Sequence, residues 1–199
     1  MFDKCIILVL DDRSIAIRRC IDLCVKRYRN MECDVIYLKT KSNITADKLS
    51  NLTVNSKLII ISHSDQYQCF SSIFGYLRPY KLHQILLKLG LKEVGLISFK
   101  GCNIGYGRFL DSLKIVIGDT IKVGYFLGYK GPSMTLFEHE CIGYLEILVH
   151  SISFGRAKIP DKYRVRILSG NIKYHIPLRN KKRWRDVFNT EMTDTEFNN

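Results

Sequence analysis

Short apolar runs recur along the chain, and stretches long enough to hold a helix separate them. Two of these runs, residues 57–62 (KLIIIS) and 94–98 (VGLIS), consist mainly of branched apolar side chains. Strands that are buried on both faces carry such continuous runs, and strands that alternate with helices lie parallel through right-handed crossovers. The pattern therefore predicts an α/β fold with a mostly parallel central sheet flanked by helices.

The other segments continue this alternation. Residues 64–79 are polar and aromatic without a clear period, which predicts a long loop. Residues 163–168 and 172–176, joined around Gly170, predict a basic C-terminal β-hairpin. The full set of predicted strands covers residues 4–10, 33–38, 57–62, 94–98 and 122–127, and the predicted helices cover about 15–30, 43–52, 82–89, 109–113 and 138–154.

Composition predicts a single globular domain with a tail. The 199 residues are 46% hydrophobic and 25% charged, which is ordinary for a globular protein. We expect the domain to cover residues 1–185, with the basic hairpin at about 156–185, and an acidic, disordered tail over 186–199. No apolar run approaches the length of a bilayer span, and the first residues lack the features of a signal peptide. A soluble, cytoplasmic protein is expected.

The seven cysteines are odd in number, and most lie inside apolar patterns. Disulfides are typical of loops in small secreted domains, so reduced thiols are expected here. Cys20 and Cys24 have a spacing that suits one face of a helix and differs from the two-residue gap of a zinc knuckle. No metal site is predicted, and every cysteine except Cys102 is expected to be a small buried hydrophobe.

The net charge of +12 is concentrated in one segment. Residues 156–185 contain eleven Lys and Arg residues against one acid, Asp161, whereas residues 186–199 contain four acids and no base. Such a block attracts polyanions, which include nucleic acid, an acidic membrane surface and small phosphorylated ligands. The candidate polyanion-binding residues are Lys173, Arg179, Lys181, Lys182, Arg183 and Arg185.

A histidine and a cysteine follow two consecutive predicted strands. His63 comes directly after the run 57–62, and Cys102 comes shortly after the run 94–98. Because the carboxyl ends of neighbouring parallel strands open into one crevice, we expect the two side chains to meet there. An imidazole that accepts the proton of a thiol makes the thiol a useful nucleophile, and Gly101 lets the backbone bend sharply before Cys102. The pair predicts a Cys-His catalytic dyad.

In this placement the chain resembles the cysteine peptidases of the caspase-hemoglobinase fold, known as clan CD. That family places its catalytic His after one strand and its Cys after the next parallel strand, as residues 59–63 (IIISH) and 96–102 (LISFKGC) do here. The resemblance covers about residues 4–132 and is nearest to the autoprocessing cysteine protease domains of large bacterial toxins and to related effector proteases. In those proteins a basic β-flap binds inositol hexakisphosphate, and effectors are delivered into a host cytosol.

The resemblance implies a cysteine endopeptidase that cleaves a protein substrate or its own precursor. His63 would act as the general base, Cys102 as the nucleophile, and the Cys102 amide as an oxyanion donor. Ser64 stands where the family commonly has Gly, and Asp65 is a candidate to orient His63. Tyr125 and residues 128–132, among them Gly128 and Lys130, match the region that lines the specificity pocket. No cofactor is needed for the chemistry, and inositol hexakisphosphate is implied as an activator.

Two other classes of protein fit parts of the same sequence. Gly101, Gly105 and Gly107 suggest a phosphate loop, and aromatic residues among the C-terminal bases suggest a nucleic-acid or polyanion binding module. The glycine spacing matches neither the dinucleotide fingerprint nor a P-loop, so this interpretation fits less well. A catalytically inactive interaction domain that keeps the caspase-like fold is the third interpretation, which Ser64 mildly favours.

Overall fold

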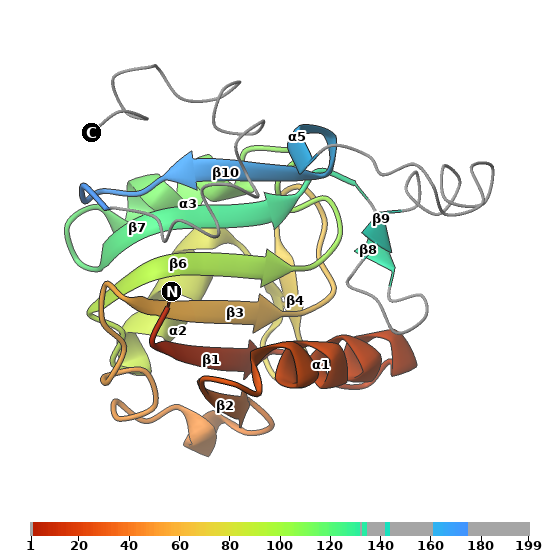
Figure 1. Ribbon diagram of the computed structural model, residues 1–199, viewed down its shortest axis with the longest axis horizontal. Coiled ribbons are helices and arrows are strands. Elements are labelled where there is room, and N and C mark those ends of the chain that lie inside the picture. The colour runs from red at the N-terminus through yellow and green to blue at the C-terminus, as the bar shows by residue number, and fades with distance from the viewer. Residues whose placement is uncertain (1, 132, 135–141, 144–160, 175–199) are drawn as a thin grey trace.

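The computed structural model describes residues 2–131, 133–134, 142–143 and 161–174, and its centre is a six-stranded sheet with the order β10-β7-β6-β3-β1-β2. Five strands are parallel and β10 is antiparallel to β7, as the arrowheads in Figure 1 show. This is the predicted mostly parallel α/β sheet flanked by helices. The strands are β1 (Lys4–Val9), β2 (Glu32–Tyr37), β3 (Ser56–Ile61), β6 (Glu93–Lys100), β7 (Lys122–Tyr129) and β10 (Val165–Ser169).

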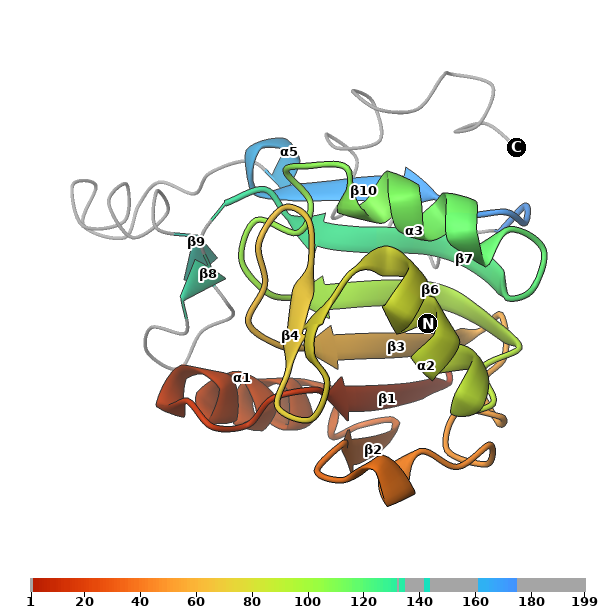
Figure 2. The ribbon, with the colours of Figure 1, turned by 180° about the vertical axis from the view of Figure 1, so that it is seen from behind.

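The central strands are buried on both faces because helices cover each side. In β1, Ile6 and Leu8 pack on the face of α2 (Pro79–Lys88) and α3 (Phe109–Ile117), whereas Ile7 and Val9 pack on the face of α1 (Ile15–Tyr28). Figure 2 shows α2 and α3 in front of the sheet, and Figure 1 shows α1 near the carboxyl end of β1. This burial explains why the strands have continuous apolar sequences.

Helix α1 is set by a cap and an apolar stripe. The Ser14 side chain accepts a hydrogen bond from the Ile17 amide at 3.2 Å, which satisfies one of the unpaired amides at the helix start. The buried residues recur at helical spacing, so one face of α1 packs against the sheet. They are Ile17, Cys20, Ile21 and Cys24.

The segment 43–52 was predicted to be a helix, and this prediction is wrong. The structure has a short 3-10 turn, η1 (Lys41–Asn43), followed by turns. The Leu49 amide donates to the Leu89 carbonyl at 2.8 Å, and the Ser50 hydroxyl donates to the Asp47 carbonyl. Polar side chains such as that of Ser50 form local hydrogen bonds, and the Leu49 amide is bonded to another segment. These bonds take the place of the backbone hydrogen bonds that a helix would have.

The predicted loop 64–79 contains a small two-stranded sheet instead of irregular chain alone. Strands β4 (Cys69–Ser71) and β5 (Gly75–Leu77) pair antiparallel, and Gly75 has a φ of +67°, which favours glycine in the connecting turn. Figure 2 shows β4 crossing the sheet near the carboxyl ends of β3 and β6. The segment therefore stands beside the crevice where the site was predicted.

The predicted C-terminal hairpin is replaced by a different pairing. Residues 163–164 belong to a short helix, α5 (Asp161–Arg164), and β10 pairs with β7. Residues 172–174 form no strand, because Gly170 and Asn171 bond back to β7: Gly170 N donates to the Gly124 carbonyl at 2.7 Å, and Val123 N donates to Asn171 Oδ1 at 2.8 Å. Residues 175–176 lie outside the described residues.

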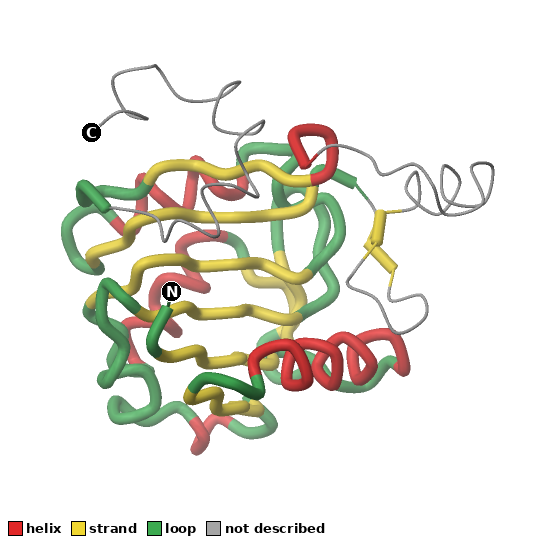
Figure 3. Tube along the Cα trace, in the orientation of Figure 1, coloured by secondary structure: helices red, strands yellow, loops and turns green. Residues whose placement is uncertain are grey.

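One further prediction fails where the structure can test it. Of the helix predicted for residues 138–154, only 142–143 are described, and they form β9 (Ile142–Gly143), which pairs with β8 (Ser133–Met134). Figure 3 shows this small sheet apart from the central one. Among the described residues, no helix has both the length and the hydropathy that a membrane span requires.

Candidate active site at the carboxyl ends of β3 and β6

The register of two adjacent strands aligns the histidine and the cysteine. The β3–β6 ladder ends at the pair Ile61 and Lys100, and His63 and Cys102 each lie two positions beyond it. Both residues therefore follow the sheet at the same edge, His63 with an exposed side chain and Cys102 half-buried. An exposed imidazole and a partly accessible thiol are the states that chemistry on a bound substrate requires.

The two segments touch through Ser64. Its hydroxyl donates a hydrogen bond to the Cys102 carbonyl at 2.7 Å. A Cβ on Gly101 would lie 2.1 Å from Ser64 Oγ and 2.8 Å from the Ser62 carbonyl, distances that no side chain tolerates. Gly101 is thus required by the close approach of the two segments. The residue that follows His63 is thus hydrogen-bonded directly to the backbone of Cys102.

The turn after Cys102 is held against the end of β7. Asn103 has a φ of +57°, the left-handed region that asparagine tolerates better than most residues. Its amide donates to the Gly131 carbonyl at 3.0 Å, and the Gly105 amide donates to the Tyr129 carbonyl at 2.8 Å. These bonds fix the direction in which the chain leaves Cys102.

The backbone beside His63 leaves one amide available. Ser64 forms a bridge with Cys69, but the hydrogen bonds of that bridge run from Phe70 N to the His63 carbonyl (2.7 Å) and from Asp65 N to the Gln68 carbonyl (3.0 Å). The Ser64 amide takes no part in them, and it has no acceptor in the described part of the chain. A backbone N-H of this kind is suited to hold a developing oxyanion.

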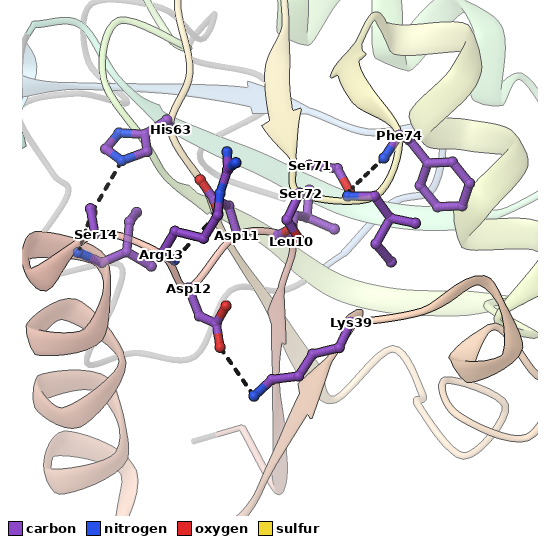
Figure 4. Close-up of polar contacts among 12 residues, drawn as sticks. Leu10, Asp11, Asp12, Arg13, Ser14, Lys39, His63, Ser71, Ser72 and Phe74 are labelled. Carbon is purple, nitrogen blue, oxygen red and sulfur yellow. Dashed lines mark hydrogen bonds and ion pairs between the residues drawn. The ribbon is translucent and has the colours of Figure 1, made fainter.

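His63 is positioned by Ser14, the N-cap residue of helix α1. Its Nε2 lies 3.1 Å from the Ser14 hydroxyl, which also accepts the Ile17 amide, and Figure 4 shows the contact. Ser14 follows β1, so the loop after that strand reaches the same edge of the sheet. Ser14 was not predicted to belong to the site, because nothing in the local sequence pattern indicates its contact with His63.

A cavity of about 400 Å³ adjoins His63. It lies between the loop after β1, the segment after β3 and the β4–β5 sheet, and its volume is within the range of small-molecule and side-chain sites. Asp11, Arg13 and Phe70 were not predicted to belong to a site. The lining residues are Asp11, Arg13, His63, Ser64, Asp65, Gln68, Phe70 and Tyr76.

Asp65, the candidate to orient His63, is occupied by its own loop. Its Oδ1 accepts the amides of Tyr67 (2.7 Å) and Gln68 (3.0 Å), and its Oδ2 accepts the Gln68 side-chain amide at 3.2 Å. These bonds form a tight turn that shapes the cavity wall. Within the described residues, no hydrogen bond joins Asp65 to His63.

The three residues predicted for the specificity pocket lie on β7 or directly after it. Tyr125 is buried in β7 and packs edge-on against Tyr174, with ring centroids 6.2 Å apart. The Gly128 carbonyl lies against Gly105, where a Cβ would approach it to 2.4 Å. Lys130 Nζ donates to the Lys162 carbonyl at 2.9 Å. None of the three lines the cavity beside His63.

Much of the predicted polyanion site falls outside the structure. Lys173 is exposed, whereas Arg179, Lys181, Lys182, Arg183 and Arg185 lie outside the described residues. Within the basic segment, Arg166 makes a two-pronged ion pair with Asp111 at 2.7 and 2.8 Å and so ties β10 to α3. Arg166 therefore stabilises the packing of β10 against α3.

The described cysteines are free thiols, and the expectation that all of them except Cys102 are buried is wrong for Cys33, which is half-buried on the edge strand β2. Five of the six lie on strands or helices, and all are buried except the half-buried Cys33 and Cys102. Burial raises the pKa of the Cys69 thiol to about 12. No cluster of His, Cys, Asp or Glu suited to hold a metal ion occurs among the residues that the structure describes.

The chain matches no protein-family model and no curated protein. Among solved structures it is similar to a secreted C11 cysteine protease from Bacteroides thetaiotaomicron, solved in complex with an irreversible peptide inhibitor. The match has 10% sequence identity and a TM-score of 0.42 and covers 65% of this chain. The matched region spans about half (49%) of the protease chain, and the likeness is one of fold.

Proposed function

We propose that the chain is a cysteine endopeptidase that uses His63 and Cys102 as its catalytic dyad. The observation that carries the proposal is the β3–β6 register, which places the two residues at equal distance beyond the same ladder. The contact from the Ser64 hydroxyl to the Cys102 carbonyl supports it, because it holds the two segments together. The strand order gives the proposal its context, since clan CD peptidases place His and Cys on these consecutive strands.

In the proposed reaction the Cys102 sulfur attacks the carbonyl carbon of a peptide bond while His63 accepts the thiol proton. The carbon–nitrogen bond then breaks, and His63 passes that proton to the departing amine. A water molecule, deprotonated by His63, attacks the thioester that remains. The new carboxyl product leaves, and the sulfur regains its proton from His63.

Two backbone donors are proposed for the oxyanion. The Ser64 amide has no acceptor among the described residues, and the family resemblance adds the Cys102 amide. Loss of one such donor typically slows acyl transfer by about a hundredfold or more. The side chain of Ser64 has a separate task in the contact with Cys102, which explains how a serine can stand where the family commonly has glycine.

The first test is thiol labelling with iodoacetamide at neutral pH, read residue by residue by mass spectrometry. We expect Cys102 to label faster than the half-buried Cys33, and His63→Ala to slow Cys102 by about tenfold or more while leaving Cys33 unchanged. Cys33→Ser is the matched control for loss of an unrelated thiol. Equal rates at the two cysteines, unaffected by His63→Ala, would support the inactive interaction domain instead.

The second test is turnover. A mixture of fluorogenic peptides should be hydrolysed by the unaltered protein, and Cys102→Ala and His63→Ala should each reduce the rate by about a hundredfold or more. Circular dichroism checks that both variants are folded. Hydrolysis that survives Cys102→Ala would exclude the proposed nucleophile.

A polyanion activator is proposed from the resemblance and the charge of the C-terminal segment. Inositol hexakisphosphate should raise the melting temperature of the protein, because a ligand that binds only the folded state stabilises it. Charge reversal at Arg179, Lys181, Lys182 and Arg183 should remove that effect. No stabilisation of the unaltered protein would contradict the proposal, and binding of single-stranded nucleic acid that weakens with salt would favour the binding-module interpretation.

A further inference from the structure

Two cysteines lie side by side on the first two strands of the sheet. The register of the β1–β2 ladder pairs Cys5 directly with Cys33. Aligned residues of neighbouring parallel strands point to the same face, and both side chains pack on the face that α1 covers. Figure 1 shows β2 at the lower edge of the sheet, next to β1. The two thiols are therefore neighbours in the fold, although helix α1 separates them in the sequence.

The spacing of the two strands suits a disulfide bond. Neighbouring strands lie about 4.8 Å apart, and a disulfide joins Cα atoms that are about 4.4–6.8 Å apart. Its Cβ atoms lie about 3.5–4.5 Å apart, so β2 must approach β1 by roughly half an ångström. As the outer strand, β2 is paired only with β1, so this approach disturbs no second ladder of the central sheet.

The two thiols differ in their access to solvent and already interact. Cys33 is half-buried, whereas Cys5 is completely buried. Burial raises the pKa of both thiols, and a hydrogen bond from the Cys5 thiol to the Cys33 sulfur partly offsets burial at Cys33. A small oxidant can thus reach Cys33, and the Cys5 sulfur stands next to the product. This is the arrangement of a redox-sensitive thiol beside a resolving thiol.

A buried lysine lies on the other side of Cys5. The β1–β3 register pairs Cys5 with Lys57, whose side chain also points to the α1 face. Lys57 is 7% exposed, and its Nζ donates to the Tyr28 hydroxyl at 2.5 Å. Burial raises the pKa of Cys5, and the charge of Lys57 acts in the opposite direction. The lysine therefore favours the thiolate that a resolving cysteine needs.

The other described cysteines are less suited to form a disulfide. Cys20 and Cys24 lie one turn apart on α1, where Cβ atoms are about 5–6 Å apart, and both are buried. Cys69 packs on the opposite helical layer of the sheet, and Cys102 lies beyond the carboxyl end of β6. The β1–β2 pair is thus the place in the described fold where an accessible thiol has a thiol in register beside it.

We propose that Cys5 and Cys33 are a redox modification site, at which a hydroperoxide produces a disulfide that fastens β2 to β1. The Cys33 sulfur attacks one oxygen of hydrogen peroxide, the oxygen–oxygen bond breaks, and a sulfenic acid and water form. The Cys5 sulfur then attacks the Cys33 sulfur, and the sulfur–oxygen bond breaks with release of a second water. Two thiols and one peroxide become one disulfide and two waters. This inference does not depend on the proposed peptidase function.

The test is treatment of the folded protein with excess hydrogen peroxide, followed by trypsin digestion and mass spectrometry without reduction. Trypsin places Cys5 in the peptide 5–13 and Cys33 in the peptide 30–39, whereas Cys20 and Cys24 share the peptide 20–26. We expect a cross-link between 5–13 and 30–39 that dithiothreitol removes. The same treatment in urea is the control, and it should give a mixture of linked peptides.

The disulfide should also be visible in the stability of the protein. A cross-link between residues 5 and 33 restricts the unfolded chain, so the melting temperature should rise by about 5 °C or more. Amide hydrogen exchange of residues 32–37 should slow by about tenfold or more, because the edge strand can no longer separate from β1. Cys33→Ser should abolish both effects of peroxide.

Variants separate the two steps of the reaction. With dimedone, which traps sulfenic acids, Cys33 should be labelled strongly in Cys5→Ala, weakly in the unaltered protein and to an intermediate extent in Lys57→Met. Cys69→Ala is the matched control, because Cys69 is equally buried but lies on the other helical layer. It should form the cross-link as the unaltered protein does. Circular dichroism checks that each variant is folded.

Three results would overturn the inference. One is a folded protein in which peroxide carries Cys33 to sulfinic acid without any link to 5–13. Another is a link from 30–39 to the peptide 20–26 in place of 5–13, which would make Cys20 or Cys24 the partner. The third is dimedone labelling of Cys33 that is equal in Cys5→Ala and in the unaltered protein.

Discussion

At the scale of single residues, the candidate site depends on close contacts in which a larger side chain would collide with its neighbours. Gly101 is the clearest case, because its missing side chain lets Ser64 reach the Cys102 carbonyl. The loop after β1 also reaches this site, where it contributes Asp11, Arg13 and Ser14. The sequence pointed to His63 and Cys102 through their positions after apolar runs, whereas these neighbours come from a loop whose path depends on tertiary packing.

Gly101→Ala should impair the site more than it impairs the fold. Its Cβ would collide with Ser64 Oγ and with the Ser62 carbonyl, so the two segments must separate. We expect Cys102 labelling by iodoacetamide to lose its dependence on His63 and the protein to lose about 1–3 kcal/mol of stability. Gly131→Ala is the matched control, because a Cβ there meets no atom of the described residues within 4 Å. An unchanged labelling pattern in Gly101→Ala would contradict the tight contact.

The burial of His83 predicts that the folded protein becomes less stable in acid. It is buried on α2, its Nε2 lies 2.8 Å from Thr120 Oγ1, and its Nδ1 has no partner among the described residues. The Thr120 hydroxyl donates to the Ile117 carbonyl, so His83 Nε2 carries the proton and Nδ1 is a bare acceptor. Burial therefore lowers the pKa of His83 below its usual value near 6.5.

The direction of the effect follows from this lowered pKa. The unfolded chain binds a proton at His83 more readily than the folded chain. Protonation of His83 therefore does not reduce the free energy of unfolding above about pH 6.5, and it reduces that free energy progressively as the pH falls below this value. Urea unfolding at pH 7.5 and pH 5.5 should show this loss, and His83→Leu should reduce the difference between the two pH values. An equal difference in the variant would exclude His83 as the source.

At the scale of elements, the sequence predicted the strand positions and the parallel pairing of β3 with β6, but it did not predict the antiparallel pairing of β10 with β7. The run 57–62 became β3 (Ser56–Ile61), and the run 122–127 became β7 (Lys122–Tyr129), because burial on both faces demands continuous apolar residues. The hairpin prediction failed because β7 offered an edge that β10 could pair with. A local pattern carries no information about such a distant partner.

The loop after β1 and helix α1 act together on the site. Ser14→Ala removes the cap of α1 and the partner of His63 Nε2 in one step, and we expect it to cost about 1 kcal/mol in urea unfolding. Ser14→Asp should restore most of the helix cap. A loss of stability in Ser14→Asp as large as in Ser14→Ala would show that the capping contact is not what the hydroxyl supplies.

At the scale of the whole molecule, the two helical layers divide the thiols into protected and accessible groups. Cys5, Cys20, Cys24 and Cys69 are buried, whereas Cys33 and Cys102 are half-buried. Burial also raises the pKa of the Cys33 thiol, which lowers the share of reactive thiolate there. The accessible group therefore contains one hindered thiol and one candidate nucleophile.

A labelling time course should separate these groups. Cys102 should react first and Cys33 second, and the four buried thiols should react only on the timescale of global unfolding. Adding urea below the unfolding transition should leave the order unchanged. Early reaction of Cys5 or Cys69 would show that the sheet opens locally.

The alignment of β3 with β6 also determines which structural change could separate His63 from Cys102. Both strands lie in the interior of the sheet, with β1 on one side and β7 on the other, so neither can slide without breaking two ladders. A shift by one residue would turn every side chain of the strand toward the opposite helical layer. The backbone positions from which His63 and Cys102 start are consequently as durable as the centre of the sheet, and amide hydrogen exchange in β3 and β6 should report on the lifetime of that alignment.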